Sequence, residues 1–95
     1  MNNVHAVEFL GPIKVSQADW FREYKGKISH KQTITSKGEM LTAVKVHVFC
    51  NSLEDGPPIG RPLRAQSEEY CVAEIRFEDF HEHDGGWIFT AYNGG

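Results

Sequence analysis

A strict two-residue alternation between positions 40 and 49 is the feature that most constrains how this chain folds. One series consists of Met40, Thr42, Val44, Val46 and Val48, and the other consists of Leu41, Ala43, Lys45, His47 and Phe49. A period of two places the two series on opposite faces of a sheet, with the valine-rich face in the core. We therefore predict a strand over residues 40–49.

Turn signals on both sides of this strand predict two antiparallel hairpins. Residues 28–35 form the first strand of one hairpin, and the turn Ser36-Lys37-Gly38-Glu39 contains a glycine that accepts positive φ. Residues 70–80 alternate again, and a polar turn that ends in two glycines leads into a last strand over 87–92. Four strands are thus expected in two hairpins.

The N-terminal third predicts one more strand and one short helix. Residues 4–9 are β-compatible, and Gly11-Pro12 is expected to stop that strand because proline lacks a ladder donor. Ser16 precedes an acid by three residues, which is typical of a helix cap, so we predict a helix from Ser16 to about Lys25. Gly26 is expected to end the helix.

These elements predict an α+β, mainly β fold over residues 1–95. It has about five antiparallel strands, namely two hairpins plus an N-terminal strand, with one short helix, arranged as an open sheet or a small partly open barrel. A chain of 95 residues is too short for two separate cores, so we expect a single domain. Unpaired strand edges in such a sheet also favour a homodimer.

Composition predicts a core that forms without a cofactor, a metal or a disulfide. Apolar residues make up 40% of the chain, and Cys50 and Cys71 match no zinc-ligand spacing. The longest apolar runs, such as residues 87–89, are far shorter than the ~20 residues that cross a bilayer. No basic region precedes an apolar run near residue 1, so we expect a cytoplasmic protein with reduced thiols and no membrane partner.

Charge is distributed unevenly along the chain. Residues 1–50 contain seven Lys or Arg and four acids, whereas residues 51–95 contain three Arg and nine acids. This asymmetry predicts one basic and one acidic face, unless strand pairing brings the two halves together and neutralises both.

The proline-rich segment 51–66 is the first candidate site. It is predicted to be a long loop, and it carries apolar and arginine side chains suited to protein contact: Leu53, Ile59, Arg61, Leu63 and Arg64. The same apolar side chains also suit packing back onto the sheet, with the arginines paired to Glu68 or Glu69. On this basis we expect a small non-enzymatic binding protein of the inhibitor or adaptor type, whose partner is another protein.

A second interpretation is a single-stranded nucleic-acid binder. Aromatic and basic side chains alternate early in the chain, and the candidates are Trp20, Tyr24, Lys25, Lys27, Lys31 and Lys37. Lysines neutralise phosphates while aromatic rings stack on bases. The alternative is that the two aromatic side chains form the core face of the predicted helix.

A third interpretation is a metal site at His81 and His83, because residues at i and i+2 of an extended segment point the same way. A structural zinc needs two further ligands. No nucleophile elbow, phosphate-binding glycine loop or dinucleotide fingerprint occurs in the sequence, so we expect no catalytic activity.

Overall fold

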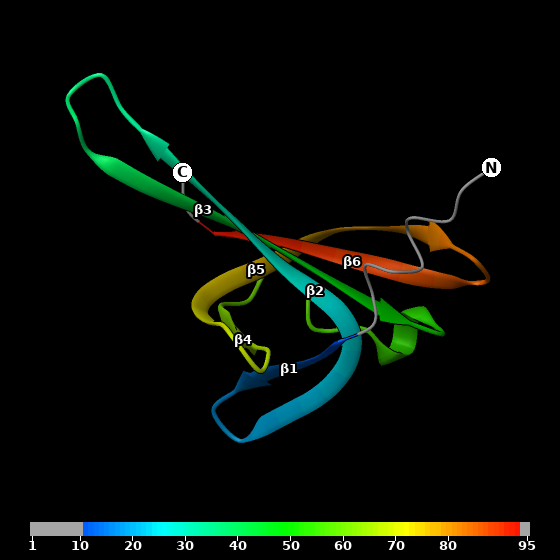
Figure 1. The fold of residues 1–95 in the computed structure, drawn as a ribbon. Helices are drawn as coiled ribbons and strands as arrows, with labels where there is room; N and C mark the ends of the chain where they lie inside the picture. The colour runs from blue at the N-terminus through cyan, green and yellow to red at the C-terminus, as the bar shows by residue number, and fades with distance from the viewer. Residues whose placement is uncertain (1–10, 94–95) are drawn as a thin grey trace.

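The protein forms one antiparallel sheet that closes into an irregular ring (Figure 1). The structure is a computed structural model, and it describes residues 11–93. The strands are β1 (Gly11–Gln17), β2 (Trp20–Ile34), β3 (Met40–Cys50), β4 (Leu63–Gln66), β5 (Cys71–His83) and β6 (Gly86–Asn93), with one 3-10 turn, η1 (Leu53–Asp55). The order around the ring is β1-β2-β3-β6-β5-β4, and β4 pairs back to β1.

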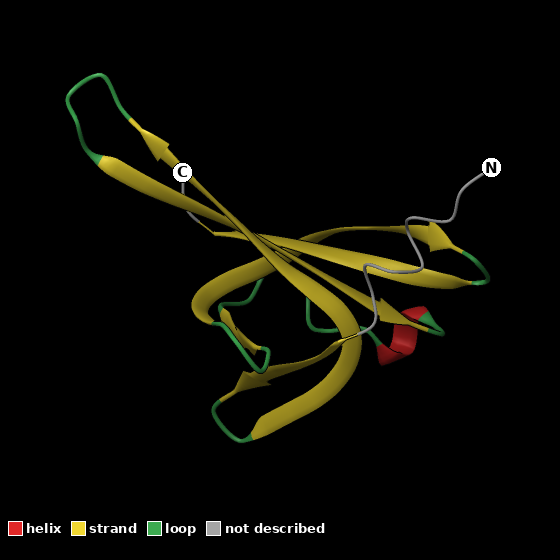
Figure 2. Cartoon of the chain, in the orientation of Figure 1, coloured by secondary structure: helices red, strands yellow, loops and turns green. Residues whose placement is uncertain are grey.

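The predicted mainly β, antiparallel architecture is confirmed, but six strands replace the expected five, the sheet is closed where an open sheet or partly open barrel was expected, and the predicted helix is wrong. Within residues 11–93 the 3-10 turn is the only helical element (Figure 2). Gln17 pairs directly with Trp20 across a two-residue turn, so the segment from Ser16 to Lys25 is a hairpin instead. Trp20 and Tyr24 share a face in a strand as they do in a helix, so their four-residue spacing did not distinguish the two.

The expected first strand over residues 4–9 lies outside the described residues, and the expected stop at Gly11-Pro12 is wrong. Both residues belong to β1, where Pro12 lies opposite Lys25 of β2. Pairing of β1 with β4 begins only at Lys14. Proline is tolerated at this end of the strand because no β4 residue pairs with it.

The proline-rich segment 51–66 is not one long loop. It contains η1 and the four-residue strand β4, which supplies the sixth strand. β4 starts at Leu63, directly after the last proline, and Leu63 and Ala65 are buried while the residues between and after them are exposed. Two buried residues are too few to produce a detectable two-residue period, so this strand was not predicted from the sequence.

The two predicted hairpins are confirmed, with longer strands than expected. β2 begins eight residues earlier than predicted, and β5 runs on to His83. The turn between β5 and β6 is therefore only Asp84-Gly85, both at positive φ (48° and 80°). Two residues at positive φ match the tight turns that connect twisted antiparallel strands.

Alternate side chains from all six strands fill the ring. Fully buried members are Val15, Val46, Val48, Ala65, Ile75, Phe77 and Ala91. Met40 and Thr42 belong to the same face of β3 but are exposed, because β6 covers β3 only from Val44 onward. Residues 31–43 consequently project from the ring as a two-stranded ribbon, here called the arm (Figure 1).

Gly26 lies where β2 is packed closely against β3, so a substitution at this position tests that packing. A Cβ at this position would lie against the backbone carbonyl oxygen of His47 and 2.9 Å from Ile13 Cγ1. We expect Gly26→Ala to lower the free energy of unfolding by about 1–3 kcal/mol, as overpacking does. Urea unfolding measures this, with Gly11→Ala as the control, because its Cβ would meet nothing closer than 3.8 Å. Equal losses in the two variants would contradict the close approach of β2 to β3.

Candidate functional site

The outer surface of β2 carries a row of lysines. Tyr24 and Gly26 are buried inside the ring, so the alternation of the strand turns Lys25 and Lys27 outward. Lys31 continues the same row two pleats further along β2. All three lysines are exposed, and all three are among the residues predicted to bind nucleic acid. The structure therefore places these three predicted residues on one face of β2.

Neighbouring strands extend this row into a broader surface. Lys45 of β3 is directly opposite both Ser29 of β2 and Tyr92 of β6, and Arg76 of β5 is opposite Tyr92. We call this surface the outer basic face, and its members are Lys25, Lys27, Lys31, Lys45, Arg76 and Tyr92. Acids lie at its margins, among them Glu23 of β2 and, around Arg76 in β5, Glu74, Glu78 and Asp79.

Cations and aromatic rings are in contact at both ends of the row. The Nζ atom of Lys45 lies 5.5 Å from the centroid of the Tyr92 ring, which is half exposed. At the other end, Lys14 Nζ lies 4.7 Å from the centroid of the Phe21 ring, which is 63% exposed. Pairs of this kind are favourable at a surface and hold the ring accessible beside a positive charge.

A hollow of about 390 Å³ lies at the base of the arm, where β2, β3 and β6 meet. Lys31, Lys45, His47 and Tyr92 are among the residues that line it. A hydrogen bond of 3.1 Å joins His47 Nδ1 and the buried Thr90 Oγ1, which fixes the imidazole against β6. The hollow thus combines two cationic groups, an accessible phenol ring and an oriented imidazole.

The other residues proposed for nucleic-acid binding lie elsewhere. Trp20 packs against the core, and Tyr24 is 7% exposed inside the ring, on the face of β2 opposite the lysines. Lys37 lies at the tip of the arm, in the turn between β2 and β3. Tyr92 provides the aromatic surface that the sequence reasoning assigned to Trp20 and Tyr24. Its place beside Lys45 depends on the β3–β6 register, for which the sequence carries no signal.

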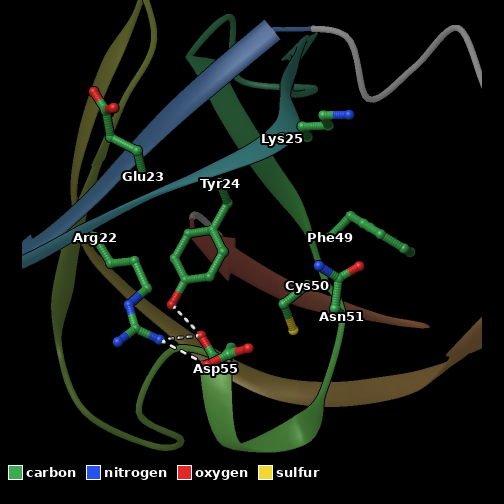
Figure 3. A pocket seen from close by; sticks show the side chains of 8 residues that line it. All are labelled: Arg22, Glu23, Tyr24, Lys25, Phe49, Cys50, Asn51 and Asp55. Atoms are coloured by element: carbon green, nitrogen blue, oxygen red, sulfur yellow. Dashed lines mark hydrogen bonds and ion pairs between the residues drawn. The ribbon is translucent and has the colours of Figure 1, made fainter.

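A second hollow, also about 390 Å³, lies at the open end of the ring next to η1 (Figure 3). The Tyr24 hydroxyl donates a hydrogen bond of 2.8 Å to the Asp55 carbonyl oxygen, and Arg22 Nη1 donates to the same oxygen at 3.0 Å. Burial raises the pKa of Tyr24 to about 12, and burial also raises the pKa of the Cys50 thiol. Both groups are therefore protonated at neutral pH, and the contacts anchor η1 to β2 rather than supply a nucleophile.

The residues predicted for protein contact divide into two groups. Leu53 and Ile59 are 44% and 47% exposed, and Arg61 and Arg64 are exposed as well. Leu63 is 3% exposed and belongs to the core, so it has no surface to offer a partner. Of the three apolar residues, Leu63 therefore packs onto the sheet, as the alternative interpretation expected.

The two histidines proposed as metal ligands lie near the end of β5. His83 Nε2 is 3.5 Å from a carboxylate oxygen of Asp84, and its ring meets Phe49 edge-on. Across residues 11–93, His81 and His83 join no group of three or more His, Cys, Asp or Glu arranged to hold a metal ion. The described part of the chain also forms no helix that is long and apolar enough to cross a membrane.

No protein-family model matches this chain, and no match is found among the curated proteins or the solved structures.

The contacts around Tyr24 predict how stability depends on pH. The pKa of Tyr24 rises from 10.0 in the unfolded chain to about 12 in the fold, so above about pH 10 the folded state retains a proton that the unfolded state loses. We therefore expect the free energy of unfolding to fall as pH rises through this window. Tyr24→Phe should flatten the decline, and should lower stability near neutral pH by about 1 kcal/mol through loss of the hydrogen bond.

Urea unfolding between about pH 8 and pH 11 measures both effects. The raised pKa of Cys50 contributes a decline of the same sign that begins near pH 9.0 and persists in Tyr24→Phe. An unchanged pH profile in Tyr24→Phe would show that this phenol does not titrate differently in the two states.

Proposed function

We propose that this chain binds single-stranded nucleic acid on the outer basic face and has no catalytic role. The observation that carries the proposal is the convergence of the β2 lysine row with the Lys45–Tyr92 pair beside an open hollow. Phosphates are bound by lysines through charge, whatever the base sequence. A row of exposed lysines along one strand suits a backbone that runs along it.

Aromatic surface is the second requirement of such a site, because base stacking holds a strand without reading its sequence. Tyr92 and Phe21 both present at least half of their surface to solvent, and each lies beside a lysine. A base stacked on Tyr92 would leave its phosphate near Lys45 and Lys31, which line the same hollow. The face thus offers charge and stacking together at Tyr92, and the Lys14–Phe21 pair adds a second stacking position beyond the other end of the lysine row.

Protein contact through segment 51–66 is the second candidate function. The exposure of Leu53 and Ile59 supports it, together with the forked donors of Arg61 and Arg64. It is the weaker candidate because Leu63, the third apolar anchor, is in the core. An inhibitor or adaptor role would rest on the four remaining residues.

Removing the charges in the hollow tests the main proposal. We expect Lys31→Ala combined with Lys45→Ala to weaken binding of a labelled oligothymidine and to reduce the dependence of log affinity on log salt by about 0.7 per lysine. Fluorescence anisotropy at about 50 and 200 mM salt measures both quantities. Arg64→Ala is the control, because it removes one exposed cation from β4, outside the face. Absence of binding by the unmodified protein at both salt concentrations would refute the proposal.

The role of stacking is tested separately at Tyr92. We expect Tyr92→Ala to weaken oligothymidine binding by about 1–3 kcal/mol, the usual effect of losing one stacked base. Tyr92→Phe keeps the ring and should retain most of the affinity. The salt dependence should stay the same in both variants, because neither changes a charge. Equal losses in the two variants would assign the effect to the hydroxyl instead of the ring.

A further inference from the structure

The arm exposes apolar side chains that the ring does not cover. Ile34 and Met40 are directly opposite each other and are 67% and 61% exposed, and Leu41 on the other face of the arm is 46% exposed. Among residues 11–93, no third strand pairs with the arm. A two-stranded ribbon is only marginally stable in water by itself, and clustered exposed apolar groups mark interaction sites.

The charge of the arm indicates the chemistry of what it meets. The charged residues of the arm are Lys31, Lys37 and Glu39, which give it a net charge of +1. One of them, Lys37, is at the tip, three residues from Ile34 and from Met40. The end of the arm therefore presents an apolar pair with Lys37 at the tip and Glu39 beside Met40, and Lys37 suits an apolar surface that a carboxylate borders.

A surface of that description exists on the same protein, at the hairpin of β5 and β6. Phe80 is 46% exposed, and its ring centroid lies 5.9 Å from that of Trp87 and 5.3 Å from that of Phe89. Glu82 is directly opposite Trp87 in the ladder. Residues 78–84 contain four acids and no lysine or arginine. We call Phe80, Trp87 and Glu82 the aromatic ledge.

The arm tip and the aromatic ledge are at opposite ends of the molecule. In Figure 1 the turn between β2 and β3 is at the upper left, and the turn between β5 and β6 is at the far right. An arm that points away from the ledge of its own chain cannot dock there. The complementary surface belongs to a different copy.

We propose that the arm of one copy docks on the aromatic ledge of a second copy, with Ile34 and Met40 against Phe80 and with Lys37 beside Glu82. Opposite charges flanking an apolar contact select the partner and the orientation. Because the two surfaces differ, the contact is heterologous. Such contacts repeat from copy to copy and form a ring or a linear array, not a simple twofold dimer.

Charge exchange between the two surfaces tests this contact. Sedimentation velocity over a concentration series, without nucleic acid, measures self-association of the unmodified protein, which we expect to observe. Lys37→Glu and Glu82→Lys should each weaken association by about fivefold or more, because each variant opposes like charges. An equimolar mixture of the two variants should associate more strongly than either alone. Glu68→Lys is the matched control, since it makes the same charge change in the β4–β5 turn.

The apolar part of the contact has its own variant. Met40→Ser should weaken association while leaving the ring intact, because Met40 is outside the core. An unmodified protein that stays monomeric at all concentrations would overturn the proposal. So would association that is equal in all variants, or a mixture no stronger than its components. None of these results depends on nucleic-acid binding, so the two proposals stand or fall separately.

Discussion

The short ladder between β1 and β4 is the constraint on which the rest of the structure depends. Three residue pairs, from Lys14–Gln66 to Ser16–Arg64, close the sheet on itself. Val15 and Ala65 form the middle pair, and both are completely buried. Because the sheet is closed, every strand of the ring has one face toward the interior and one face toward solvent. The orientation of each side chain then follows from its parity along the strand.

That parity is what assembles the candidate site. Tyr24 and Gly26 of β2 point into the ring. Lys25 and Lys27, which alternate with them, therefore point outward. Gly26 also allows β2 to approach β3 closely, since any side chain there would collide with the His47 carbonyl. The register of the lysine row with Lys45 belongs to this β2–β3 packing, whereas the Lys45–Tyr92 pair depends on the register between β3 and β6.

Local patterns predicted the parts of the fold that they determine. The valines at 44, 46 and 48 are buried as the alternation requires, and the lysines at 25, 27 and 31 lie together. The helix prediction failed because a capping pattern and a four-residue aromatic spacing are compatible with a hairpin as well. β4 was missed because it is four residues long. Tyr92 was missed for a different reason: its neighbours are set by pairing between distant segments, and no local pattern encodes that register.

The same strand pairing determines whether the basic and acidic segments of the sequence lie apart in the folded protein. Strand pairing would have neutralised the basic half if β3 lay directly beside the acidic β5. Instead β6 lies between them, and Gly86–Asn93 contains no charged residue. One strand therefore separates Lys45 of β3 from Glu78 and Glu82 of β5, and two strands separate the lysines of β2 from them. The neutral strand β6 thus separates the basic face, proposed to bind a polyanion, from the acidic edge, proposed to contact Lys37 of a neighbouring copy. Both proposed contacts therefore depend on the position of β6 in the ring.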